Sequence, residues 1–187
     1  MQGFDAYTGE GVSGKYEILG DDMQILTVNL KDGELLTTEP GTMSFMSNDI
    51  KPGVNCGAFF KRCMSANPCI MSTYRGASDS SYVAVTPKLP AKVVPIETGA
   101  LGGSAMRCKS GSYLAHVGDV TLDFDFDCNC LTCCCAGQGC VRQKVKGTGS
   151  AFLTAMGTIL TKELAEGEVL VVDTNSVVAW QDTVKLG

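Results

Sequence analysis

Six cysteines lie within thirteen residues, and their spacing is the one pattern in the sequence with the composition of a metal site. Cys130 and Cys133 are separated by two residues, a spacing that lets two thiolates bind one tetrahedral zinc ion, and Cys135 or Cys140 could complete the set. Zinc sites usually join two separated pairs, whereas these cysteines are compressed into the single segment 128–140. We therefore favour loop thiols without a chemical role, and keep zinc or copper(I) binding, and lipidation or redox sensing, as alternatives.

His116 is the only histidine in the sequence, so it is the single imidazole that could act as a general base. Ser112 lies four residues before it and Asp119 three residues after it, which invites comparison with a catalytic triad. Because side chains alternate between the two faces of a strand, Ser112 and His116 share one side and Asp119 lies on the other. The spacing predicts a half-exposed strand histidine, and we expect no enzyme activity.

Three carboxylates, Asp123, Asp125 and Asp127, alternate with Phe124 and Phe126. Such a row of carboxylates on one face of a strand could bind Ca²⁺ or Mg²⁺. The commoner explanation is a solvated strand face whose phenylalanines enter the core, and we favour it.

Composition narrows the classes of partner. The 187 residues include 15 basic and 20 acidic side chains, a net charge of −5, which gives no reason to expect DNA and argues against RNA. There is no run of 18 apolar residues, so membrane association is expected only through partners. Residues 1–5 resemble neither a secretory signal nor a transit peptide, so we expect an intracellular protein, cytoplasmic or organellar.

The elements that must position these side chains are predicted to be strands. Alternating, β-branched and aromatic segments predict strands at residues 25–30, 82–85, 92–96, 120–126, 151–155 and 168–173. Turns rich in glycine separate them, and the chain has 22 glycines. Many short strands with such turns are typical of an all-β sandwich or barrel.

One sequence pattern occurs three times, at residues 30–50, 103–120 and 164–184. Gly-Glu-Leu-Leu at 33–36 returns as Gly-Glu-Val-Leu at 167–170, which is 134 residues later. The middle copy lies 70 residues after the first and 64 before the last. Repeats of this kind indicate a fold of similar units stacked on one another, which is typical of scaffolds and binding proteins.

The repeats predict one domain over residues 15–187. Its three units span about 16–51, 73–127 and 146–187, and residues 1–14 are expected to be a flexible lead-in.

The sole tryptophan, Trp180, occupies the position that Met46 and His116 hold in the other copies. Because the residue type differs between copies, we expect it to cover a seam between repeats or to anchor a partner, without a shared chemical role.

The order and spacing of these blocks over residues 16–186 resemble the altered inheritance of mitochondria protein 24 family, also called mitochondrial biogenesis proteins. The blocks that carry the resemblance are residues 20–34, 39–43, 147–159, 167–173 and 178–180. The resemblance implies a β-sandwich, or short double-stranded β-helix, like that of the tryptophan RNA-binding attenuation protein. It also implies three units around a pseudo-threefold axis, and three chains in one ring.

Two features depart from the family pattern. Residues 128–140 have no counterpart in it, apart from Cys140, which matches a buried apolar position. The given sequence also stops at Gly187, soon after the third repeat, where relatives usually continue with another pair of strands.

Together these observations predict a non-catalytic, homo-oligomeric β-scaffold, a trimer or a subunit of a larger complex. By family resemblance it would serve a mitochondrial or other organellar assembly. The alternatives are a module that binds a small ligand or RNA between units, and a metal or redox protein that uses the cysteine segment.

Overall fold

A computed structural model describes residues 5–7, 12–57, 70–126 and 141–186. These residues form short antiparallel strands and two 3-10 turns, η1 (Thr98–Leu101) and η3 (Thr174–Ser176). The predicted all-β class is confirmed. Within the described ranges, no helix has the length and hydropathy needed to cross a membrane.

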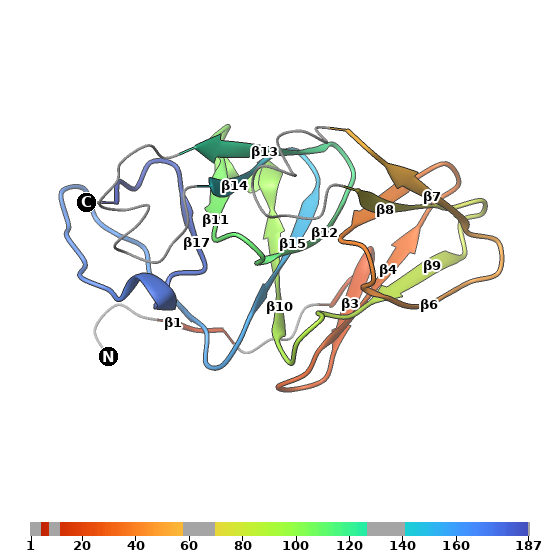
Figure 1. Cartoon of the computed structure of the whole chain (residues 1–187), viewed down its shortest axis with the longest axis horizontal. Coiled ribbons are helices and arrows are strands. Elements are labelled where there is room, and N and C mark those ends of the chain that lie inside the picture. The colour runs from red at the N-terminus through yellow and green to blue at the C-terminus, as the bar shows by residue number, and fades with distance from the viewer. Residues whose placement is uncertain (1–4, 8–11, 58–69, 127–140, 187) are drawn as a thin grey trace.

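The strands form three main sheets and one small pair (Figure 1). The five-stranded sheet has the order β2 (Val12–Ser13), β3 (Tyr16–Leu19), β4 (Ile25–Leu30), β9 (Ser81–Val85), β6 (Met43–Met46). The six-stranded sheet has the order β10 (Lys92–Glu97), β15 (Ser150–Ala155), β12 (Tyr113–Val117), β5 (Leu35–Thr38), β8 (Met71–Arg75), β7 (Lys51–Asn55). The four-stranded sheet has the order β13 (Val120–Phe126), β14 (Val141–Gly147), β11 (Met106–Cys108), β17 (Ala179–Gln181).

The six-stranded sheet packs against both of the others, because its central strands bury side chains on two faces. Phe152 of β15 belongs to the core shared with the five-stranded sheet, while its neighbours Ala151 and Leu153 belong to the core shared with the four-stranded sheet. This is the alternation expected of a strand between two packed layers.

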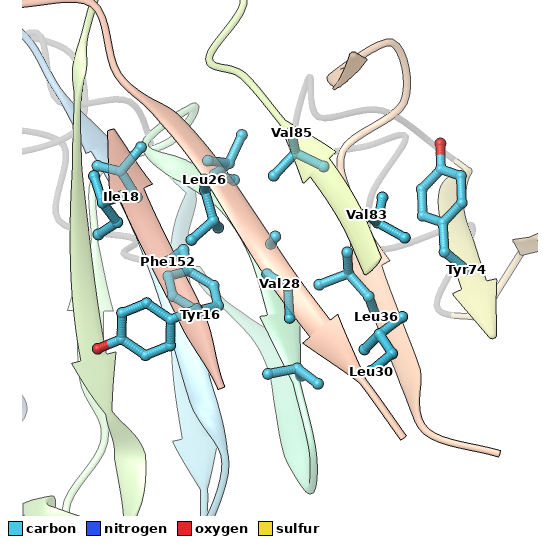
Figure 2. Packing of buried hydrophobic residues seen from close by; sticks show 14 of the residues in the cluster. Tyr16, Ile18, Leu26, Val28, Leu30, Leu36, Tyr74, Val83, Val85 and Phe152 are labelled. Atoms are coloured by element: carbon cyan, nitrogen blue, oxygen red, sulfur yellow. The ribbon is translucent and has the colours of Figure 1, made fainter. Parts of the chain in front are cut away.

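The larger core lies between the five- and six-stranded sheets. Figure 2 shows Leu26 and Val28 of β4 close to Phe152, with Tyr16 beside its ring. The Tyr16 and Phe152 rings meet edge to face with their centroids 4.9 Å apart. The smaller core includes Cys108, which is fully buried.

Five of the six strands predicted from alternation are confirmed, as β4, β9, β10, β13 and β15. The sixth is wrong, because residues 168–173 form no strand and lie exposed. Alternation indicates that a segment suits a sheet, but a strand also needs a neighbour for its backbone hydrogen bonds, and no described strand lies alongside this segment.

Two parts of residues 1–14, the predicted flexible lead-in, are paired in sheets. β1 (Asp5–Ala6) pairs with β16 (Leu160–Thr161), and β2 pairs with β3. The Tyr7 hydroxyl also donates a hydrogen bond to the Val93 carbonyl at 2.8 Å.

Candidate functional site at the seams between repeats

The four predicted zinc ligands, Cys130, Cys133, Cys135 and Cys140, lie outside the described residues. Within the part of the chain that the structure describes, no three metal-ligating side chains gather together. Cys108, in the smaller core, is deeply buried, and burial raises the pKa of its thiol to about 12. A thiol in that state is a small core hydrophobe rather than a nucleophile.

His116 is positioned next to a tyrosine and not next to the serine of the triad pattern. Its Nδ1 lies 2.7 Å from the Tyr113 hydroxyl, whereas the Ser112 hydroxyl donates to the Lys109 carbonyl at 2.6 Å. Asp119 is exposed. The described contacts therefore place Ser112 and His116 in two separate hydrogen-bond arrangements.

The acidic row is described only in part. Asp123 accepts a hydrogen bond from the backbone N–H of Phe124 at 2.9 Å, and Phe124 is buried, as the solvated-face interpretation predicts. Asp127 and the side chains of Asp125 and Phe126 fall outside the described set.

The most distinctive geometry lies where one repeat meets the next. At the first seam, β5 of the first repeat pairs with β12 of the second, and Leu36 lies opposite Val117. The Tyr113 hydroxyl crosses this seam and donates to the Thr37 carbonyl at 3.1 Å. That hydroxyl also lies beside His116, so the histidine belongs to the seam.

At the second seam, β11 of the second repeat pairs with β17 of the third, and Arg107 lies opposite Trp180. The Trp180 side chain is only 9% exposed, and the guanidinium carbon of Arg142 lies 5.3 Å from its ring centroid. Of the two roles predicted for Trp180, the covering of a seam matches this position. The role of Trp180 as a partner anchor stays a prediction.

A carboxylate joins the same seam to its neighbouring strands. Asp182 accepts a hydrogen bond from the Ala105 backbone N–H at 3.2 Å and lies 3.3 Å from the Lys144 ammonium group. The hydrogen bond from Ala105 and the nearby Lys144 charge lower the pKa of Asp182. Asp182 therefore holds the turn after β17 against β11 and β14.

The two seams share one register. Leu36, Thr37 and Thr38 lie opposite Val117, His116 and Ala115. At the second seam, Met106, Arg107 and Cys108 lie opposite Gln181, Trp180 and Ala179. Each of these six residues is the repeat equivalent of the residue in the same place at the first seam. The same contact between neighbouring units is thus made twice in one chain.

A cluster of hydroxyls fixes the corner that follows β6. Asp49 accepts hydrogen bonds from Ser47 at 2.5 Å, from Ser78 at 2.6 Å and from Ser81 at 2.5 Å. These bonds, with that of Ser47 the strongest, hold the pKa of Asp49 well below its usual value of 3.8. Asp49 has no distinctive sequence signal, because Ser-Asn-Asp after a strand indicates only a turn.

Replacing Asp49 by asparagine is expected to lower the melting temperature and to weaken its dependence on acid. Because the folded-state pKa lies below that of the unfolded chain, the stabilisation is complete above about pH 3.8 and is lost as the pH falls below it. An asparagine amide accepts fewer and weaker bonds from the three hydroxyls. Thermal unfolding between pH 6 and pH 2 tests this, with the exposed neighbour Asp79→Asn as the control. Parallel acid profiles for wild type and D49N would contradict it.

Two elements, one in the first unit and one in the third, lack the partner strand that their repeat equivalents have at the two seams. This holds among the strands that the structure describes. β6, the first-repeat equivalent of β12 and β17, is the last of the described strands in its sheet, and among these strands it pairs only with β9. Residues 169–172, the third-repeat equivalent of β5 and β11, pair with no described strand.

Comparisons with known proteins agree with this architecture. A family model described as mitochondrial biogenesis AIM24 matches residues 16–187. No curated protein matches the chain. Among the solved structures that match is a Streptococcus pyogenes protein from a structural genomics consortium, with a TM-score of 0.58 and 16% identity. The match covers 76% of this chain and 65% of that one, so this chain spans less than two thirds of that relative's length. At this identity the similarity concerns the fold alone.

Proposed function

The chain belongs to the mitochondrial biogenesis AIM24 family, and from this premise we propose that it is a non-catalytic, homo-oligomeric β-scaffold. It supports the biogenesis or organisation of a larger assembly in mitochondria or a related organelle. The family description supports the biological setting, and the repeated units support the physical role.

The observation that carries the proposal is the repeated seam. One register joins the first unit to the second and the second to the third, so the chain makes the same strand-to-strand contact between units twice. Repeated contacts between similar units are typical of scaffolds and binding proteins, which suits a structural component.

The side chains that could act as a nucleophile or a base support the proposal that the scaffold is non-catalytic. The Ser112 hydroxyl, His116 and Asp49 all make hydrogen bonds that hold turns or seams together. Cys108 is buried with a raised thiol pKa. The hydroxyls that lie beside a base are those of Tyr113 at His116 and of three serines at Asp49, and their hydrogen bonds hold a seam and a turn, which supports a structural role for them.

The proposal is tested in cells that make the protein at its normal level. A scaffold is expected to migrate in native gels of gently lysed cells at a mass well above that of the purified chain, and removal of the chain should shift other subunits of that assembly to lower mass. A chain that migrates in extracts as it does when pure, and whose removal changes no other complex, would refute the scaffold function.

A further inference from the structure

We propose that residues 168–173 of one chain pair, as a strand, with the free edge of β6 of a second copy. This head-to-tail contact repeats between chains the seam that joins the units within a chain. The inference deepens the proposed oligomeric scaffold, on which it rests, by naming the two strands that join its subunits.

β6 has the character of an edge that receives a partner. Phe45 is 51% exposed and Met43 is also exposed, although both lie in a sheet strand. The strand Met-Ser-Phe-Met carries no charge and no proline, the two devices that usually protect an open edge.

The other edge strands of the main sheets are protected. β7 carries Lys51 and Pro52, β10 carries Lys92 and Pro95, and β13 carries Asp123. β2 and β17 are only two and three residues long. Among the described edges, β6 alone combines useful length with an unprotected, apolar surface.

Residues 168–173 have the complementary character. Val169 is 85% exposed and Val171 is 91% exposed, in a stretch of four consecutive apolar residues. The equivalents of Val171 and Val172 in the first repeat, Thr37 and Thr38, are buried because strands flank them on both sides. A β-branched apolar run left in water at a position that is buried elsewhere in the chain points to a missing neighbour.

Both observed seams predict one register for the new pairing. When each residue of either seam is replaced by its repeat equivalent in the first or third unit, Phe45 lies opposite Val172, Met46 opposite Val171, and Ser47 opposite Leu170. The two seams are separate sets of contacts, so their agreement supports the assignment. Ser47 belongs to the Asp49 cluster, which holds that end of β6 in place.

The partner is a second copy because the two elements lie too far apart within one chain. Figure 1 shows β17 and the C-terminus at one end of the molecule and β6 at the opposite end. The segment 168–173 is held near β17, which is fixed to β11 by its ladder. It reaches a β6 edge only on a neighbouring molecule.

Such a contact joins two different surfaces, so the first pairing leaves a free β6 edge on one copy and a free segment 168–173 on the other. Interfaces of this type close into rings when the rotation between subunits permits. The ring of three chains that the family resemblance implies is one such closure.

The first test places a charge in the proposed strand. Val171→Lys leaves an isolated chain unaffected, because that side chain already lies in water, but it puts an ammonium group into the pairing. We expect the dissociation constant, measured by sedimentation equilibrium, to rise about 100-fold. The matched control is Val54→Lys, which makes the same change at an exposed valine of the protected edge strand β7 and should leave the mass unchanged.

The second test uses the polarity of the contact. Phe45→Lys blocks the β6 surface and V171K blocks the other, so each variant alone should be a monomer. Their mixture has one intact pair of surfaces and should form a heterodimer with one copy of each, seen by native mass spectrometry. Circular dichroism checks that both variants fold. Hydrogen exchange at residues 170–172 should be slow in the wild-type oligomer and fast in the V171K monomer.

The outcomes separate the pairing from the scaffold. A wild-type oligomer that V171K leaves intact, a V54K variant that dissociates equally, or a mixture that stays monomeric would overturn the pairing while the oligomeric scaffold stands. A wild type that is monomeric at every concentration would overturn both.

Discussion

Replacing Phe152 by alanine is expected to lower the free energy of unfolding by about 3–5 kcal/mol. The Phe152 ring is fully buried in the core between the five- and six-stranded sheets, where it meets the Tyr16 ring edge to face. Its removal leaves a cavity that the two sheets, held by their own ladders, fill only in part. The loss would also remove the contact between aromatic rings.

Urea unfolding, followed by circular dichroism and by the fluorescence of Trp180, measures this loss. Phe152→Leu is the matched control, since it keeps most of the buried volume and should cost much less. Transitions for F152A that coincide with those of the wild type would contradict the position of Phe152 at the centre of the sandwich.

Replacing Trp180 by alanine is expected to cost about 3 kcal/mol, near the lower end for buried aromatic side chains, because β17 has only three residues. Trp180 covers the seam between the second and third units and lies against the Arg142 guanidinium. Without the ring, the Arg142 side chain loses a cation–π contact, and the β11–β17 ladder loses its cover.

Trp180→Phe is the control, because it keeps an aromatic face for Arg142. Hydrogen exchange should show early opening of β17 and of the following turn in W180A, with the five-stranded sheet still protected. Equal opening of all sheets, or none at all, would show that Trp180 does not hold the third unit to the second.

Much of the fold is predictable from local pattern. Alternation located β4, β9, β10, β13 and β15, because each of these strands turns apolar side chains into a core from at least one of its faces. Alternation also predicted a strand at residues 168–173. That prediction is wrong, because these residues form no strand in the single chain. The residues suit a strand, but their pattern carries no information on whether a neighbouring strand is present.

The seams were less accessible to sequence reasoning. The Tyr113 hydroxyl bonds a carbonyl 76 residues away, and the Asp49 cluster joins serines from two distant turns. No local spacing encodes such contacts, which depend on how the sheets pack. The repeats did hold the necessary information, since equal spacing of the copies is matched by equal register of the two seams.

The most direct test of the central claim is native mass spectrometry of the purified wild-type chain at micromolar concentration. The scaffold of repeated units, whose end strands are completed by neighbouring copies, predicts an oligomer, with three chains as the expected mass. A spectrum that shows the single chain alone, at every concentration from micromolar upward, would contradict it.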